Sequence, residues 1–406
     1  MGKTNGKNSR DVVIVGAART PIGRFMGALS PLSAPQLGAV AVQAAVQRAG
    51  VNPASVEEAL IGQVVAAGSG QAPGRQAALW GGLPSSVGAI SVNKACGSGL
   101  KAVMLSASAI KAGDGDVYVA GGIESMSNAP YLLPNARNGA RYGHTQMLDS
   151  VITDGLWCAF EKHLMGNSAE FIADKLEVTR EEMDEFALES HKKAVAAIDA
   201  GRFKEEIIPV EIKHAKGRVT VVDTDEAPRR DTSLEALAKL KPAFKPDGRV
   251  TAGNAPGLND GAAAVVVTSR EYAQAHGLKP LARIVGYTHA AVEPLWLFIA
   301  PARAVPRLLD KIGWKLADAD LIEINEAFAA QVLADGRELE QNGHAWDWGK
   351  VNVNGGAVAL GHPVGASCAR VLVTLIHALK QRDRERGIAT LCLGGGEAVA
   401  MAIELE

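Results

Sequence analysis

The chain has 406 residues, with 42 Lys or Arg and 44 Asp or Glu, so its formal net charge at pH 7 is −2. This length allows two or three domains and a large buried core. The balanced charge gives no reason to expect nucleic acid or a strongly anionic surface as a partner. The sequence contains no apolar stretch long enough for a membrane-spanning helix, so we expect no membrane partner.

The first ten residues (MGKTNGKNSR) are polar and lack the apolar core of a secretory signal. Gly6 breaks the pattern for N-terminal myristoylation. Four widely spaced cysteines suit a reducing compartment and do not suggest a disulfide framework. These features lead us to expect a soluble protein of the cytoplasm.

The N-terminal part of the chain alternates short apolar runs with apolar residues at helical spacing. The runs, which are typical of buried parallel strands, lie at residues 11–16, 59–65 and 116–122. Helices are expected at residues 34–49, at 74–79 and directly after Cys96, and a loop is expected at 17–23. This alternation predicts an α/β architecture with a mainly parallel sheet.

Polar loops with proline and glycine breaks interrupt this alternation over residues 125–245. One strongly helical stretch runs from Arg180 to Ala200, with Thr179 as the expected N-cap and Glu182 placed for a capping box. We interpret the segment as an inserted loop domain. The predicted division is an N-terminal half at residues 1–124 continued by 246–279, the inserted domain at 125–245, and a C-terminal half at 280–406.

The C-terminal half repeats the order of the N-terminal half. Residues 282–286 resemble the opening strand, and residues 320–324 resemble the run through Leu60. Residues 351–356 then match the run before Cys96, and residues 389–396 match the last strand of the first half. A duplicated fold tends to place its site where equivalent strand-to-helix turns face each other, so we expect the site between the halves.

Cys96 is the first candidate functional residue. A β-branched run precedes it, and Gly97 and Gly99 open a helical pattern after it, so it should lie at a helix N-terminus. The free N–H groups and the helix dipole at such a position favour a thiolate. A lone cysteine before a helix is more often a small buried hydrophobic residue, so this position alone does not establish catalysis.

Three further positions, His362, Cys392 and Asn325, lie near the ends of equivalent strands. A cysteine nucleophile needs a base within hydrogen-bond reach, and histidine suits that role near neutral pH. Taken singly, His362 is more often a packing residue and Cys392 a core residue, and we interpret Cys158 and Cys368 as structural. No pair of Cys or His has the short spacing of a zinc site, so no metal is expected.

Seven motifs, found in the same order from about Val12 to the end, resemble those of the thiolase family. They are ARTPIG (18–23), VNKACGSG (92–99), GGIESMS (121–127), TAGN (251–254), NEAF (325–328), NGGAVALGHP (354–363) and CLGGG (392–396). Together these motifs are highly specific. Residues 221–226 and 239–244 of the inserted domain are most similar to the acetoacetyl-CoA branch of this family.

The resemblance implies a five-layer αβαβα fold of two βαβαβαββ halves, and a loop domain that helps to bind CoA and to assemble a homotetramer, a dimer of dimers. Cys96 would attack a thioester carbonyl while His362 takes its proton, and Cys392 would remove a proton from the α-carbon of a second acetyl-CoA. One oxyanion hole would use His362 and a water held by Asn325. The other would use the N–H groups of Cys96 and Gly394. No cofactor is implied, because CoA and acyl-CoA are substrates.

The resemblance also implies which residues contact the substrate: Met165, Arg229, Phe244, Pro256, Leu297, Phe298 and Phe328. Two of these places depart from the usual family pattern. Pro256 replaces the usual Ser beside the pantetheine arm, and Leu297-Phe298 replaces the usual Met-Gly. Phe298 adds bulk to a segment that lines the acyl pocket in the family, so we expect a preference for short acyl groups.

The principal hypothesis is therefore a reversible Claisen condensation of two acetyl-CoA to acetoacetyl-CoA, or the thiolysis of a short 3-ketoacyl-CoA. The alternatives are a degradative 3-ketoacyl-CoA thiolase with longer or unusual substrates and a non-catalytic thiolase-like binding subunit. A cysteine hydrolase built from Cys96, His362 and Asn325 is a further alternative, but such an enzyme has no use for Cys392.

Overall fold

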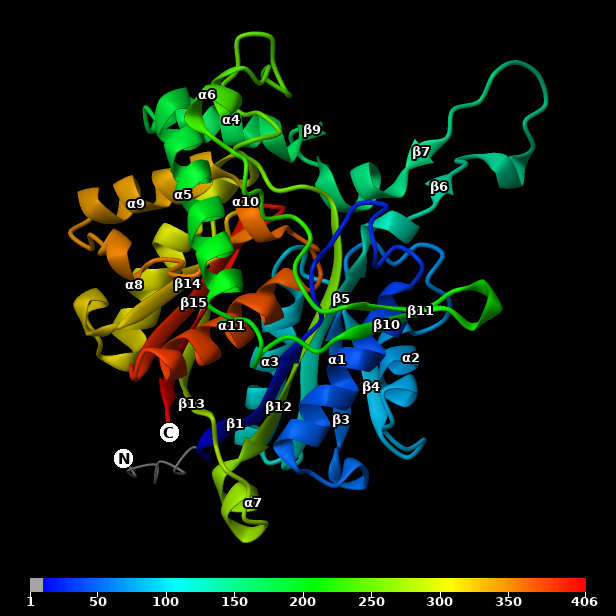
Figure 1. Ribbon diagram of the computed structural model, residues 1–406, viewed down its shortest axis with the longest axis vertical. Helices are drawn as coiled ribbons and strands as arrows, with labels where there is room; N and C mark the ends of the chain where they lie inside the picture. The colour runs from blue at the N-terminus through cyan, green and yellow to red at the C-terminus, as the bar shows by residue number, and fades with distance from the viewer. Residues whose placement is uncertain (1–9) are drawn as a thin grey trace, which may run out of the picture.

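The computed structural model describes residues 10–406 (Figure 1), and the N-terminal segment with Gly6 lies outside the described residues. A ten-stranded mixed sheet runs through both halves in the order β14-β15-β16-β13-β1-β12-β5-β3-β4, with the short β2 paired to β12. β1 (Val12–Arg19) and β13 (Ala282–Ala291) join the two halves through two residue pairs. The sheet is therefore continuous, although the halves meet through a short contact.

The two halves share one strand topology. In the N-terminal half, β3 (Glu58–Gly62) is parallel to β4 and β5, and β12 (Asn259–Ser269) is antiparallel to β5 and β1. In the C-terminal half, β14 is parallel to β15, and β16 is antiparallel to β15 and β13. A parallel bridge between Ile322 and Val351 takes the place of a strand equivalent to β4. The other strands of the sheet are β2 (Gly23–Arg24), β4 (Gly88–Val92), β5 (Val117–Ser125), β14 (Leu321–Ile324), β15 (Arg386–Leu393) and β16 (Glu397–Leu405).

The expectation of a mainly parallel sheet is wrong, because β12 and β16 both run against their neighbours. The chain re-enters the sheet at β12 after the long inserted segment, and a tight turn at residues 394–396 reverses it before β16. β12 is buried along its whole length. A strand buried on both faces shows a continuous apolar run whichever way it points, so its direction was not visible in the pattern.

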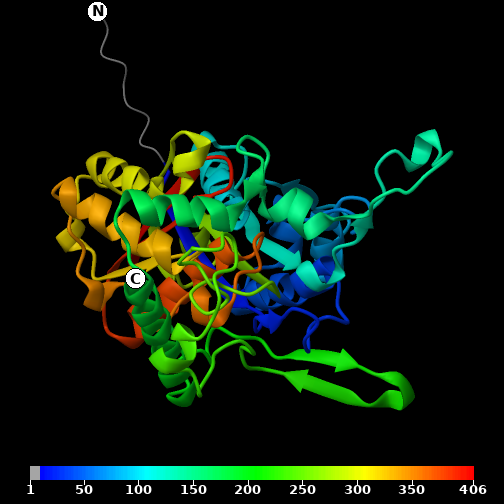
Figure 2. The same cartoon turned by 90° about the horizontal axis from the view of Figure 1, so that it is seen from above.

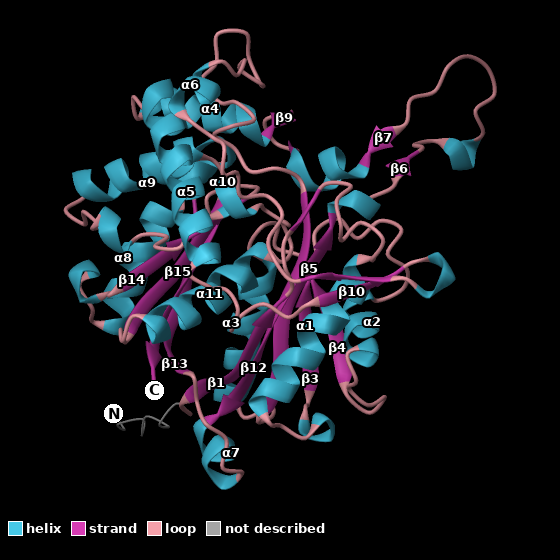
Figure 3. Cartoon of the chain, viewed as in Figure 1, coloured by secondary structure: helices cyan, strands magenta, loops and turns pink. Residues whose placement is uncertain are grey.

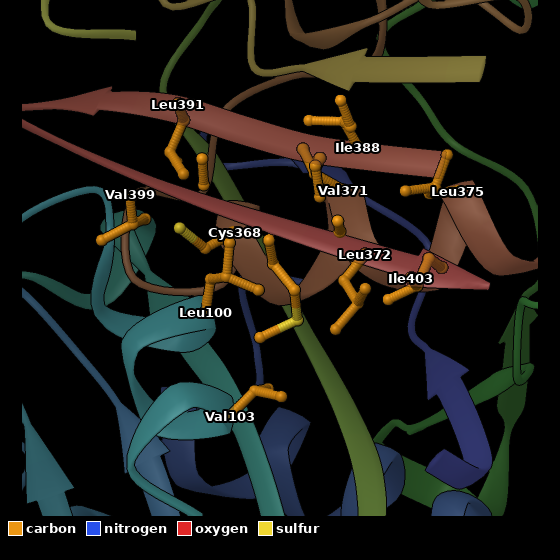
Figure 4. Close-up of a cluster of buried hydrophobic side chains, with 14 of the residues drawn as sticks. Leu100, Val103, Cys368, Val371, Leu372, Leu375, Ile388, Leu391, Val399 and Ile403 are labelled. Atoms are coloured by element: carbon orange, nitrogen blue, oxygen red, sulfur yellow. The ribbon is translucent and has the colours of Figure 1, made fainter. Parts of the chain in front are cut away.

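The helices form three layers around the two halves of the sheet (Figure 3). α1 and α2 cover the outer side of the N-terminal half, α8 and α9 lie on the outer side of the C-terminal half, and α3 and α11 pack together between the halves. Figure 4 shows side chains of α3, such as Leu100, against α11 and the strands β15 and β16. This arrangement confirms the expected αβαβα layers. The helix bounds are α1 (Ala34–Ala49), α2 (Pro73–Trp80), α3 (Ser98–Ala112), α7 (Arg270–Ala275), α8 (Pro301–Ile312), α9 (Ala329–Gln341), α10 (Ala357–Leu360) and α11 (Ser367–Gln381).

The segment at residues 125–245 contains three helices and several short hairpins. Its α5 begins after Thr179, which forms the predicted capping box with Glu182, and packs against α9 and α10. Two arms project from the body of the molecule (Figure 2), one at residues 131–149 and one formed by β10 and β11. The elements are β6 (Tyr131–Leu132), β7 (Leu148–Asp149), β8 (Trp157–Cys158), β9 (His163–Leu164), α4 (Met165–Lys175), α5 (Arg180–Asp199), β10 (Val210–Lys213), β11 (Val219–Val222) and α6 (Leu234–Ala238).

A buried ionic cluster fastens this segment to β1. The strand continues to Arg19, past the predicted loop start at residue 17, and the Arg19 side chain is fully buried. Its Nε donates to Glu206 at 2.6 Å, and its two terminal nitrogens donate to Asp225 at 2.7 and 2.9 Å. A charge this deeply buried is stable only when it is paired, and the two acidic partners here come from the inserted segment.

No helix within residues 10–406 combines the length and apolarity needed to cross a membrane.

Candidate active site

Cys96 lies in the turn between β4 and α3, as the sequence predicts. Ala95 before it has a φ of +45°, a left-handed conformation that is strained for a residue with a side chain. The hydroxyl of Ser98 donates to the carbonyl oxygen of Ala95 at 2.6 Å and holds this bend. The next residue is Gly97, where a Cβ would lie 2.0 Å from Cδ2 of Leu393. Glycine at this position therefore lets the turn of one half meet a strand of the other.

His362 is held by hydrogen bonds at its backbone and its ring. Its backbone N–H donates to Oδ1 of Asn259 at 2.9 Å, and its Nδ1 lies 2.5 Å from the hydroxyl oxygen of Ser367. That hydroxyl in turn donates to the carbonyl oxygen of Pro363 at 3.0 Å, so it is free to accept from an Nδ1–H. This assigns the proton of the neutral ring to Nδ1 and leaves Nε2 as a base. Nε2 lies 3.5 Å from the amide nitrogen of the buried Asn325.

Cys392 and Gly394 lie at the end of β15, opposite the Cys96 turn. Cys392 is buried, and the nearby Cys96 adds to the burial that disfavours ionisation of its thiol. The backbone N–H groups of Gly394 and of Cys96 itself are directed at the Cys96 sulfur. Two backbone donors that converge in this way can stabilise negative charge on sulfur or on an oxygen bound near it.

One pocket of about 180 Å³ brings these groups together. Cys96, His362, Cys392 and Gly394 line it, and the rest of its wall is mostly apolar. The larger apolar side chains of the wall belong to Met126, Leu156, Met165, Phe244, Pro256, Leu258, Leu297, Phe298, Phe328 and Val364. Such a wall excludes water, and electrostatic interactions inside it are stronger than in solvent.

Three aromatic rings form one side of the pocket. Phe298, in the 3-10 helix Pro294–Ile299, is buried and lies edge-to-face with Phe328, with 5.3 Å between the ring centroids. Phe328 makes a second edge-to-face contact with Phe244 at 6.2 Å. A Cβ on Gly166 would lie only 2.2 Å from the Phe244 ring, so that ring has no room to move toward α4. The wall is therefore held in place by packing.

Burial keeps both members of the Cys96–His362 pair neutral. It raises the pKa of the Cys96 thiol to about 11, although the N–H groups of Gly394 and Cys96 act in the opposite direction. Burial lowers the pKa of His362 to about 3 and raises that of Cys392 well above its ordinary value. The helix N-terminus favours a thiolate at Cys96, as expected from the sequence, but desolvation acts more strongly in the opposite direction. The resting site contains two thiols and a neutral imidazole.

A second, more polar cavity of about 250 Å³ adjoins the first. Arg229 and Arg24 line it together with His191, whose Nδ1 accepts the backbone N–H of Arg229 at 3.1 Å. Burial and these two arginines lower the pKa of His191 to about 4, so the ring stays a neutral acceptor. The two cavities share the residues Ala255, Gly257 and Leu258.

Among residues 10–406, no three His, Cys, Asp or Glu side chains are arranged to hold a metal ion.

Two family models cover almost the entire chain. The model described as "Thiolase, N-terminal domain" matches residues 12–271, and "Thiolase, C-terminal domain" matches residues 278–405. The chain belongs to the thiolase family. This assignment confirms the family and the fold class that were expected from the sequence.

Relatives of this thiolase include proteins named acetyl-CoA acetyltransferase. The one from Pseudomonas aeruginosa is 55% identical over 97% of this chain and 99% of its own length, and the one from Cupriavidus necator is 53% identical with the same coverage. The crystal structure of the Bacillus anthracis acetyl-CoA acetyltransferase superposes with a TM-score of 0.95 at 46% identity, and covers 98% of this chain and 99% of that one. The acetyl-CoA acetyltransferase of Syntrophomonas wolfei gives a TM-score of 0.96 at 44% identity, with 98% and 100% covered.

The structure of the thiolase gathers most of the site residues predicted from its sequence around one pocket. Six predicted substrate contacts line that pocket together with both cysteines, His362 and Gly394. Asn325 lies behind His362 and does not line the pocket, and Arg229 lines the adjoining cavity. The six are Met165, Phe244, Pro256, Leu297, Phe298 and Phe328.

The sequence of the thiolase did not lead us to three residues that support His362. Ser367 fixes the ring, Asn259 fixes the backbone, and Glu124 accepts an N–H from the loop between His362 and Ser367. A signal existed for Glu124, because it lies inside the GGIESMS motif that supports the resemblance. Asn259 is more than a hundred residues away from His362 in the sequence, and no local pattern connects the two.

Proposed function

We propose that this thiolase is an acetyl-CoA acetyltransferase that condenses two acetyl-CoA reversibly to acetoacetyl-CoA and CoA. The observation that supports it best is the meeting of two thiols, Cys96 and Cys392, with the base His362 in one apolar pocket. A hydrolase needs only one thiol, whereas a condensation needs a nucleophile and a second proton-transfer group. The names of the relatives agree with this assignment.

In the proposed first half-reaction, the sulfur of Cys96 attacks the thioester carbonyl as its proton moves to Nε2 of His362. The carbonyl oxygen becomes an oxyanion, and the N–H groups of Cys96 and Gly394 are available to stabilise charge in this region. The carbon–sulfur bond to CoA then breaks. The leaving CoA sulfur takes the proton of Cys392, whose raised pKa keeps that proton present in the resting site.

In the second half-reaction, the Cys392 thiolate takes a proton from the α-carbon of the next acetyl-CoA. The enolate attacks the acetyl group on Cys96, a carbon–carbon bond forms, and the Cys96 sulfur leaves and regains its proton from His362. Both thiols and the imidazole return to their starting forms. Every proton step is assigned to a side chain of the chain, so the scheme requires no metal or redox cofactor, and CoA and acyl-CoA are its substrates.

We infer that CoA lies across the two adjoining cavities. The thioester would lie in the apolar pocket, and the phosphate-bearing end would lie toward Arg229 and Arg24 in the polar one. Pro256, on the wall of the apolar pocket, offers no hydroxyl to the pantetheine arm. His191 supports this assignment indirectly, because it holds the backbone at Arg229 in place.

We propose a homotetramer assembled as a dimer of dimers, because the chain exposes apolar side chains in two separate places. Ile90 is 41% exposed on β4, which ends the order of the sheet, and Trp80 is 57% exposed on the neighbouring α2. On the arm at residues 131–149, Tyr131 is 64% and Tyr142 fully exposed. Two different self-complementary surfaces generate a tetramer with two kinds of interface. Native mass spectrometry tests this assembly.

We also propose a cytoplasmic location, because the two reacting thiols must stay reduced to work.

The activity is tested with the purified chain in both directions, by condensation of acetyl-CoA and by thiolysis of 3-ketoacyl-CoAs of increasing chain length with CoA. Turnover with acetoacetyl-CoA that is lost in Cys96→Ala supports the proposal. Release of free acid from an acyl-CoA without condensation would support the hydrolase alternative.

A further inference from the structure

Glu124 connects the two halves at the active site. It lies near the end of β5 and is fully buried. Its carboxylate accepts the backbone N–H groups of Val64 at 3.1 Å and Val65 at 3.3 Å, just after β3 of the same half. It also accepts the N–H of Gly365 at 3.0 Å, from the loop of the other half that carries His362. One carboxylate therefore spans the seam between the halves.

The backbones of the two halves approach each other closely beside this contact. A Cβ on Gly365 would lie 2.5 Å from the carbonyl oxygen of Ile123 and 2.9 Å from Oε2 of Glu124. A Cβ on Gly122 would lie 2.1 Å from the carbonyl oxygen of Gly365. The two backbones touch directly here, and the Glu124 carboxylate bonds to both of them.

The carboxylate also acts electrostatically on Cys96. Burial raises the pKa of Glu124 to about 7, and the charged side chain that acts on it is Asp260 of β12, which is acidic as well. Glu124 in turn raises the pKa of Cys96, and the thiols of Cys368 and Cys392 are the other titratable groups that interact with Cys96. A negative charge at this place opposes a thiolate on Cys96.

We propose that Glu124 is a positioning residue that clamps the His362 loop onto the N-terminal half and so fixes the place of the base relative to Cys96. It does not touch the reacting atoms. Its role rests on the proposed function, in which the Cys96 proton must pass to His362 when the acyl group arrives.

The test compares Glu124→Gln with a matched control, Asp260→Asn. Glutamine keeps the size of the side chain, removes the charge, and directs an amide N–H at one of the three backbone donors. Asp260 is also a buried carboxylate, but neither of its partners, Ser125 and Ser127, belongs to the C-terminal half. The measurements are the pH dependence of Cys96 alkylation by iodoacetamide, located by peptide mapping, and kcat and KM for acetyl-CoA.

Glu124→Gln is expected to move the alkylation profile of Cys96 to lower pH by about half a unit or more. Its kcat should fall at least about tenfold while KM changes by less than about threefold, because the loop and not the CoA site is affected. Asp260→Asn should leave kcat within about twofold of wild type, because its partners do not belong to the His362 loop. A kcat within about threefold of wild type in Glu124→Gln, or equal effects on kcat in the two variants, would overturn the proposal.

A second variant decides the matter if Glu124→Gln yields no folded protein. Glu124→Asp keeps the charge but shortens the side chain, so kcat should fall while the alkylation profile stays at the wild-type pH. A wild-type kcat in that variant would overturn the clamp. If the wild-type chain does not condense acetyl-CoA, the proposed function fails, and the alkylation profiles still decide whether the charge of Glu124 acts on Cys96.

Discussion

The hydroxyl of Ser367 lies 2.5 Å from Nδ1 of His362 and 3.0 Å from the carbonyl oxygen of Pro363, so a single serine orients the imidazole and selects its tautomer. Ser367→Ala removes the acceptor of the Nδ1 proton and leaves a buried N–H without a partner. We expect kcat to fall by about 10- to 100-fold with KM nearly unchanged, because a misdirected base affects proton transfer more than binding. Ser367→Thr keeps the hydroxyl and serves as the control. A kcat within twofold of wild type in Ser367→Ala would contradict the tautomer assignment.

Replacing Cys96 or Cys392 by serine should block a different step of the reaction in each case. Cys392→Ser leaves Cys96 and His362 in place, so it should still take up an acetyl group from acetyl-CoA. Its condensation rate should fall by the ~10²–10⁴-fold typical of losing a general base. Cys96→Ser has a hydroxyl that is far less ionised, so no stable acyl-enzyme should accumulate. Intact-protein mass after incubation with acetyl-CoA, paired with a condensation assay, separates the two outcomes. Normal condensation by Cys392→Ser would remove the second thiol from the mechanism.

Phe298 is expected to limit the length of the acyl group. Its ring is buried on the pocket wall and held edge-to-face by Phe328, so a longer chain would have to displace it at a cost of about 1–3 kcal/mol. Phe298→Ala should raise kcat/KM for six-carbon 3-ketoacyl-CoA relative to acetoacetyl-CoA by roughly tenfold or more. Phe171→Ala is the matched control, because Phe171 contacts Trp296 of the same 3-10 helix and does not line the pocket. Equal ratios in both variants would show that chain length is set elsewhere.

Cys96 should be the first of the four cysteines to react with iodoacetamide. It is partly exposed in the pocket, whereas Cys158, Cys368 and Cys392 are buried. Since its pKa is raised to about 11, the reaction should be slow at pH 7 and accelerate steadily as the pH rises. Peptide mapping after short exposure at pH 7 and pH 9 measures this order. Earlier labelling of Cys158 or Cys368 would count against the site geometry.

His377 on α11 should reduce stability in acid. Burial lowers its pKa below the ordinary 6.5, and neither ring nitrogen has a hydrogen-bond partner among the described residues. Below pH 6.5 the unfolded chain takes up a proton that the native state binds less well, so the free energy of unfolding falls as the pH falls. His377→Leu should therefore raise Tm, and raise it more at pH 5 than at pH 8. The exposed His276→Leu is the control, and an equal gain at both pH values in His377→Leu would refute the argument.

Local signals predicted the elements that a few neighbouring residues determine. The capping box of Thr179 and Glu182, the helix that ends at Gly50 and the turn at Cys96 were all visible in the sequence, because each depends on contacts within a few residues. The internal repeat was visible too, since buried strands keep their apolar runs.

Other features depend on contacts between distant segments. The direction of β12 and β16 was hidden because buried strands look alike in either orientation. The protonation of Cys96 could not be predicted because the helix N-terminus is a local feature, whereas burial comes from packing by the whole fold. The support of His362 by Asn259 and Glu124 crosses more than a hundred residues in each case.

The position of β1 has a consequence for how the chain folds as it is made. Both neighbours of this strand, β12 and β13, begin roughly 240 residues or more after β1 ends. At ~5–20 residues per second, the ribosome needs on the order of 10 to 50 seconds to deliver them. Throughout that interval the apolar run Val12–Arg19 has no strand partner, and it would be open to pairing with another nascent chain. The order of strands in the sheet thus makes a chaperone that shields the emerging N-terminus valuable to this protein well before its active site exists.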